Sequence, residues 1–268
     1  MTRRDHAGAM RSRYRRSMDQ TTTTAVPALA GHLHAELPAT PSSVLLGRPR
    51  LVAALTTAFL ALALGAALWG GELLLTWDEP IQRSVEARRT AFLDDLFLTV
   101  SRLGSTIPVL VVGTVTAAVA WRRCRAVGTA VLVATVSRPL VEFTVKALVD
   151  RERPDFERLV AGNGPSFPSG HVMAAMALWG LMPLVVSLYT RRRAVWWASV
   201  AAAAALVAGI AASRVYLGVH WFSDVTGGLI VGAFFLLGVE AVLIRQHARH
   251  PCRLLGDDSW RRPSSPGT

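Results

Sequence analysis

Apolar residues fall into long runs, separated by short polar or arginine-rich stretches. Each run has about 20 residues, the length at which an α-helix crosses the hydrocarbon core of a bilayer. We therefore expect an all-α protein, a six-helix transmembrane bundle. Its helices are predicted to span roughly residues 51–69, 104–121, 126–149, 168–189, 194–213 and 224–244.

Three stretches lack this apolar pattern. Residues 1–47 and 246–268 are rich in polar residues, arginine and proline, so we expect two disordered cytoplasmic tails around a membrane domain at 48–245. Within 71–105, Asp78-Glu79-Pro80 predicts a helix start, because acidic residues and proline favour the first helical turn. This stretch is either a helix in the membrane interface or a helix in an extracytoplasmic loop.

The distribution of charge predicts the orientation in the membrane. The net charge is +11, but the arginines flank the predicted helices instead of forming a basic face with aromatic residues, so no nucleic-acid partner is expected. With six helices, the arginine clusters all fall on one side, which is then the cytoplasmic side and holds both termini. Cys124 and Cys252 also fall there, so no disulfide bond is expected.

The segment Ser213–Asp224 carries candidate chemistry between two apolar runs. Arg214 is a planar, two-pronged donor that can bind an anion. His220 can act as a base or nucleophile near neutral pH. Asp224 follows His220 by four residues, so one helical turn would place its carboxylate beside the imidazole, fix the tautomer and stabilise the imidazolium.

Two basic residues before a proline form a second candidate segment. Lys146, the single lysine among 29 basic residues, precedes Arg153 by seven positions, and both share one face if the helix continues. Pro154 disfavours helix at Arg153 and ends the element. With Arg214, these residues supply three cations that can stabilise the charge of a phosphoryl group in its transition state.

The third segment, Pro168-Ser169-Gly170-His171, predicts a helix N-terminus. Free amides at such an end bind phosphate, Gly170 lets the backbone approach closely, and the Ser169 hydroxyl can donate to a phosphate oxygen. His171 would then project beside the bound group. All three segments lie at the extracytoplasmic ends of predicted helices, so we expect the active site at that membrane face.

The three segments read K-x6-R-P, P-S-G-H and S-R-x5-H-x3-D, and in this order they resemble the type 2 phosphatidic acid phosphatase (PAP2) superfamily over roughly residues 51–245. The resemblance implies that His220 is the nucleophile that forms a phosphohistidine, Asp224 its orienting partner and His171 the general acid. It implies that the substrate phosphate is bound by Lys146, Arg153, Ser169, Gly170 and Arg214.

The resemblance also implies an integral membrane lipid phosphatase. The substrate would be a lipid phosphomonoester or pyrophosphate, such as undecaprenyl pyrophosphate, phosphatidylglycerophosphate or phosphatidic acid. We expect membrane lipids as surroundings and no metal or other cofactor, because the nearby acids have no metal-ligand spacing and are typical of a solvated loop: Asp150, Glu152, Asp155 and Glu157. The oligomeric state stays open.

Two alternatives to a hydrolase stay open. One is a phosphotransferase that uses the same intermediate with a lipid or sugar acceptor. The other is a non-catalytic membrane protein that binds or transports lipids. A haloperoxidase is disfavoured, because the known haloperoxidases of the superfamily are soluble and this chain has a membrane domain.

Arg138, Glu142 and Lys146 form a charged stripe, four residues apart on one predicted helix face. An unpaired charge inside a membrane helix costs about 2.5–3.5 kcal/mol. We therefore expect Glu142 to neutralise Arg138 and hold Lys146 toward the phosphate. In the alternative, Arg138 reaches the cytoplasmic surface and Glu142 is only structural.

Overall fold

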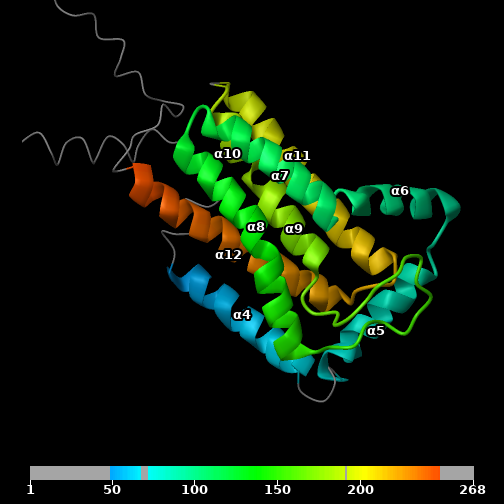
Figure 1. Ribbon diagram of the computed structural model, residues 1–268. Coiled ribbons are helices and arrows are strands. Elements are labelled where there is room, and N and C mark those ends of the chain that lie inside the picture. Colours follow the sequence, from blue (N-terminus) through cyan, green and yellow to red (C-terminus); the bar gives the residue numbers. More distant parts are fainter. Residues whose placement is uncertain (1–48, 68–71, 191, 248–268) are drawn as a thin grey trace, which may run out of the picture. The chain divides into compact units, whose positions relative to one another are not determined.

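A computed structural model describes residues 49–67, 72–190 and 192–247 (Figure 1). Its regular elements over these residues are all helical, which confirms the predicted all-α class. They are α4 (Pro49–Ala67), α5 (Glu72–Glu86), α6 (Ala91–Arg102), α7 (Thr106–Trp121), α8 (Arg125–Val149), α9 (Gly170–Leu178), the 3₁₀ helix η2 (Trp179–Leu181), α10 (Met182–Ser187), α11 (Arg193–Tyr216) and α12 (Phe222–His247).

Helix α9 is the centre of the bundle. It packs against α7, α8, α11 and α12, and Val172, Met173 and Leu178 on it are fully buried. Small residues allow this packing: a Cβ at Gly232 of α12 would lie 2.3 Å from the Met176 side chain. Because α9 begins beside the ends of α8 and α11, its N-terminus is surrounded by the segments that carry the candidate chemistry.

Large apolar side chains are exposed on the outside of the bundle. Ile107 on α7 and Phe143 and Leu148 on α8 are each more than 70% exposed, as expected for helices that face hydrocarbon. Over the described residues, four helices are long and apolar enough to cross a membrane, or five if α6 and α7, bent by 48°, form one span. The protein therefore has several membrane-spanning helices, and the count of six stays a prediction.

The described helices correct three expectations. The helix start predicted at Asp78-Glu79-Pro80 is wrong: α5 begins at Glu72 and contains Pro80, and the Asp78 carboxylate bonds to Arg151 instead of serving a first helical turn. The predicted helix 168–189 is broken by η2. Cys124 is disulfide-bonded, so the expectation of no disulfide, which rested on the inferred membrane side, is also wrong.

Candidate active site

The three candidate segments meet at one end of the bundle. Backbone hydrogen bonds join them there: Ser169 N donates to Asp224 O at 3.0 Å, and Ser166 N donates to Arg151 O at 2.7 Å. The loop 150–169, α9, the end of α11 and the start of α12 therefore form one site (Figure 1).

His220 and Asp224 lie close together, but the backbone between them is not the single helical turn that was predicted. His220 precedes α12, which begins at Phe222, so the two residues do not share a helical turn. The His220 Nδ1 atom lies 3.5 Å from Asp224 Oδ2. Nδ1 makes no hydrogen bond at this distance, and the Asp224 carboxylate is its nearest acidic neighbour.

The other ring nitrogen of His220 faces Arg153. Arg153 Nη1 lies 3.4 Å from His220 Nε2, and it also donates to Val219 O at 2.6 Å. Because a guanidinium can only donate, Nε2 accepts, and the proton of the neutral ring is on Nδ1, toward Asp224. Nε2 is thus the atom with a lone pair directed into the site.

The surroundings keep His220 neutral. Its side chain is 3% exposed, and burial is the main cause of a pKa well below the usual value near 6.5. The positive charges of Arg214, Arg153 and Lys146 lower this pKa further. A neutral imidazole is the form that a nucleophilic histidine requires.

Arg153 reaches the site from a loop and not from a helix. Helix α8 ends at Val149, and Asp150 adopts a left-handed conformation with φ 45°, which turns the chain out of the helix. Loop carbonyls then hold the guanidinium: Arg153 Nε donates to Gly164 O at 2.9 Å and Nη2 to Asn163 O at 3.0 Å. Burial is the main cause of a lowered Arg153 pKa.

The start of α9 has the features of an anion site. Ser169 is the N-cap residue, its hydroxyl makes no hydrogen bond, and its side chain is fully buried. A Cβ at Gly170 would collide with the Glu142 carboxylate, so glycine leaves room for that carboxylate beside the start of α9. The first amides of α9 and the unpaired Ser169 hydroxyl are donors available to a phosphate.

The remaining predicted residues also lie at this site. His171, in the first turn of α9, is within electrostatic range of Lys146, Arg214 and His220. Arg214 is 5% exposed and donates to Ser101 Oγ at 2.5 Å. The structure therefore brings together all eight residues that the sequence predicted.

The charged stripe on α8 is paired as predicted. Glu142 bonds to Arg138, and its Oε1 atom lies 3.0 Å from Lys146 Nζ. Arg138 is 2% exposed and also donates to Thr106 Oγ1 at 3.2 Å, so it does not extend to the cytoplasmic surface. Glu142 is thus one carboxylate between two cations, beside the start of α9.

Sequence reasoning missed several residues of the site. Ser105, in the turn between α6 and α7, bonds to His171 Nε2 at 3.3 Å, and Ser101 holds Arg214. Arg151 donates to Asp224 at 2.8 Å, but no role was predicted for Arg151 because it lies in a loop rich in charged residues. Nothing in the spacing of these residues indicates the site; their contacts arise from tertiary packing.

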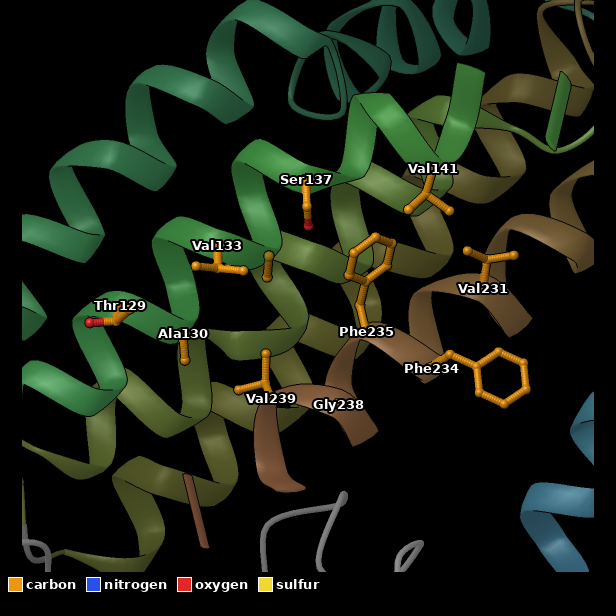
Figure 2. A pocket seen from close by; sticks show the side chains of 11 residues that line it. Thr129, Ala130, Val133, Ser137, Val141, Val231, Phe234, Phe235, Gly238 and Val239 are labelled. Carbon is orange, nitrogen blue, oxygen red and sulfur yellow. The ribbon is translucent and has the colours of Figure 1, made fainter. Parts of the chain in front are cut away.

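A cavity between α8 and α12 lies further along the two helices that carry Lys146 and Asp224 (Figure 2). Its volume is about 420 Å³. Valine and phenylalanine side chains provide most of its lining, including Val133, Phe235 and Val239. Such a lining suits a hydrocarbon chain better than a polar ligand.

The described residues contain no group of three or more His, Cys, Asp or Glu side chains that could hold a metal ion. The acids Asp150, Glu152, Asp155 and Glu157 are all exposed.

A buried histidine–carboxylate pair, surrounded by cations at a helix N-terminus in a helical bundle, has the charge arrangement that suits phosphoryl transfer. Comparison with known proteins agrees: the model of the PAP2 superfamily matches residues 126–248. Phosphatidylglycerophosphatase B of Bacillus subtilis (strain 168) is 31% identical over 170 residues, which cover 60% of this chain and 81% of that protein. This chain belongs to the PAP2 superfamily.

A solved structure supports the same fold. The crystal structure of the first transmembrane PAP2 type phosphatidylglycerolphosphate phosphatase from Bacillus subtilis matches with a TM-score of 0.67 and 25% identity, over 72% of this chain and 96% of that one. The protein is thus a membrane phosphatase of the PAP2 family, a phosphoric monoester hydrolase.

Proposed function

We propose that the protein hydrolyses a lipid phosphomonoester or pyrophosphate through a phosphohistidine at His220. The observation that carries this proposal is the placement of the buried His220 ring, with Nε2 3.4 Å from Arg153 Nη1 and Nδ1 3.5 Å from Asp224 Oδ2. Lys146, Arg153 and Arg214 would hold the phosphate oxygens, with the Ser169 hydroxyl and the amides from Gly170 onward.

The reaction then has two steps. In the first, His220 Nε2 attacks phosphorus, the bond from phosphorus to the leaving oxygen breaks, and His171 gives its proton to that oxygen. Asp224 stabilises the positive charge that forms on His220. In the second, His171 removes a proton from water, the water oxygen bonds to phosphorus, and the phosphorus–nitrogen bond breaks to release phosphate and free His220.

The substrate class follows from the relatives and from the membrane setting. The relatives named above act, by their names, on phosphatidylglycerophosphate, and the apolar cavity between α8 and α12 suits a substrate with a long hydrocarbon tail. Phosphatidylglycerophosphate, undecaprenyl pyrophosphate and phosphatidic acid are therefore the candidates. Membrane lipids would surround the protein, its oligomeric state stays open, and neither step needs a cofactor.

Phosphate release from purified lipids tests this proposal. The protein in detergent is given each of the three candidate lipids with EDTA present, and released phosphate is measured. Phosphate release from at least one lipid is expected, with its rate unchanged by EDTA. Transfer of the phosphoryl group to an added lipid or sugar instead of water would favour the phosphotransferase, and no turnover of any lipid would favour a non-catalytic lipid-binding protein.

The proposed architecture is a six-helix domain at 48–245 with cytoplasmic tails at 1–47 and 246–268, which lie outside or almost outside the described residues. In it the site faces outward. The arginine clusters support this orientation, whereas the disulfide at Cys124, typical of an oxidising compartment, favours the opposite one. The two signals conflict because Cys124 and Lys146 lie near opposite ends of α8.

Cysteine labelling decides between these orientations. Both native cysteines are replaced by serine, and single cysteines are then placed at exposed Asn163 in the site loop or at Thr190, after α10. An impermeant thiol reagent added to intact cells should label the cysteine at 163 and not the one at 190. Labelling at 190 alone would place the site on the cytoplasmic side.

A further inference from the structure

Arg151 joins two carboxylates that are distant in the sequence. Its Nη1 atom donates to Asp224 Oδ1 at 2.8 Å, and its Nη2 atom donates to Asp78 Oδ2 at 2.8 Å. The three side chains are each 1% exposed or less. Burying three charges is costly unless they are paired with good geometry, and here each prong of one guanidinium has its own carboxylate.

Ser223 fixes the far end of this cluster. Its backbone N donates to Asp78 Oδ1 at 2.9 Å, and its hydroxyl bonds to Asp78 Oδ2 and accepts from Arg151 Nη1 at 2.6 Å. Asp78 belongs to α5, whereas Ser223 and Asp224 are in the first turn of α12. The cluster therefore attaches α5 to the turn of α12 that carries the orienting carboxylate.

The near end of the cluster faces the reacting histidine. Asp224 Oδ1 accepts from Arg151, while Oδ2 accepts from Trp221 N at 2.9 Å and lies 3.5 Å from His220 Nδ1. Both oxygens are thus held, and the one toward His220 keeps acceptor capacity. A rotation of the Asp224 carboxylate would break the bonds to Arg151 and Trp221.

The charges in the cluster show what Asp78 adds. Two carboxylates and one guanidinium have a net charge of −2 + 1 = −1. If Arg151 paired with Asp224 alone, that pair would be neutral and would stabilise a positive charge on His220 only weakly. With Asp78 as the second partner of Arg151, the cluster beside His220 keeps one negative charge.

We propose that Asp78 is a positioning residue for the phosphoryl-transfer step: through Arg151 it orients Asp224 and preserves the negative charge that stabilises His220. This inference rests on the proposed function, because it assumes that Asp224 acts on His220. It also gives α5, which carries none of the three motifs, a part in the reaction.

The substitution Asp78→Asn removes the charge and keeps the shape. We expect kcat to fall by about 10- to 100-fold, the usual effect of losing a partner that orients a reacting group. KM should change little, because the proposed phosphate ligands Lys146, Arg153 and Arg214 do not bond to Asp78. The assay is steady-state phosphate release from a lipid that the wild type hydrolyses.

Gln82→Leu is the matched control for the docking of α5. Gln82 lies one turn after Asp78, is fully buried and donates from Nε2 to Val215 O at 3.2 Å, without a bond to Arg151. This variant should have a lower melting temperature and a wild-type kcat. If Asp78→Asn and Gln82→Leu lower kcat equally for equal losses of melting temperature, the role of Asp78 is only structural and the proposal is overturned.

A double-mutant cycle with Asp224→Asn separates a positioning role of Asp78 from a purely structural one. It compares the effect of Asp78→Asn on kcat with and without the Asp224 carboxylate. If Asp78 acts through Asp224, Asp78→Asn should lower kcat in the wild type and have no further effect in the Asp224→Asn background. Multiplicative losses in the double variant would overturn the inference alone. A wild-type kcat in Asp224→Asn itself would overturn the proposed mechanism and the inference with it.

Arg151→Lys keeps the test open if Asp78→Asn does not fold. Lysine retains the positive charge but does not offer the two fixed prongs that bridge both carboxylates. We expect a loss of kcat that again disappears in the Asp224→Asn background. A wild-type kcat in Arg151→Lys would contradict the bridging role.

Discussion

Glu142 provides the sharpest test of how charge is arranged around the phosphate. Its carboxylate bonds to Arg138 and lies 3.0 Å from Lys146 Nζ, with side-chain exposures of 20% for Glu142 and 18% for Lys146. It also lies against Gly170, at the start of α9. The substitution Glu142→Gln keeps the size of this side chain and removes its charge.

The structure sets the expected magnitude. Two unit charges 3.0 Å apart attract by about 5 kcal/mol at an effective dielectric constant of 20, but desolvation offsets much of this. A hydrogen bond to a charged group contributes about 1.5–3 kcal/mol net. If that interaction positions Lys146, Glu142→Gln should lower kcat by about 10- to 100-fold, since 1.4 kcal/mol corresponds to tenfold.

The same substitution should strengthen the binding of phosphate. Removal of one negative charge beside Lys146 and the start of α9 lowers the repulsion on a bound dianion. We therefore expect inorganic phosphate and vanadate to inhibit Glu142→Gln at lower concentrations than the wild type. A lower kcat with tighter product binding separates loss of positioning from general damage to the site.

The assay compares three proteins at equal expression and with measured melting temperatures. Thr144→Val is the matched control, because Thr144 is exposed on the same helix and bonds only to Leu140 O, at 2.9 Å. It should retain wild-type kcat and phosphate inhibition. A wild-type kcat in Glu142→Gln, at a melting temperature equal to that of the control, would refute the reasoning and leave Glu142 a structural role.

Three further predictions concern the histidines and the metal-free mechanism. His220→Ala should form no phosphoenzyme, whereas His171→Ala should retain part of its rate on substrates with good leaving groups; equal losses on good and poor leaving groups would contradict the acid role of His171. Activity should survive EDTA and be inhibited by vanadate; loss with EDTA and recovery with Mg²⁺ would contradict it. Because the folded-state pKa of His220 is lowered, the unfolded chain binds an extra proton below about pH 6.5, so the wild type should lose stability relative to His220→Gln as the pH falls from about 7.5 to about 5. Equal pH dependence of both melting temperatures would contradict a neutral, buried His220.

The sequence predicted the parts of the molecule that depend on local pattern. Runs of apolar residues indicated α7, α8, α11 and α12 to within a few residues, because a bilayer requires long apolar helices. The motif residues His220, Asp224 and Arg153 were found because their spacing matches a known family. The local backbone of two of these residues was not predicted: His220 lies before α12, and Arg153 lies in a loop.

The parts that escaped prediction depend on contacts between distant segments. Asp78 in an acidic Asp-Glu-Pro sequence is typical of a helix start, and that interpretation uses only its neighbours along the chain. In the fold, its carboxylate is fully buried and bonds to Arg151, 73 residues away. A local rule fails here because the acidic residue serves a tertiary contact and not a helix start.

The buried charges of α5 and its neighbours need a physical reason. Apolar packing alone would hold α5 against the bundle at a lower desolvation cost than a cluster of Asp78, Arg151 and Asp224. Such a cluster imposes what apolar contacts do not: a fixed direction for each carboxylate oxygen, and a net negative charge at a chosen point. That point is Asp224 Oδ2, 3.5 Å from the ring nitrogen opposite the proposed nucleophilic atom of His220. The same reasoning applies to Glu142, which holds Lys146 beside the start of α9. Asp78, which the sequence patterns left without a role, and Glu142, whose pairing they predicted, are thus each joined through one cation to the proposed site: Asp78 through Arg151 to Asp224, and Glu142 directly to Lys146.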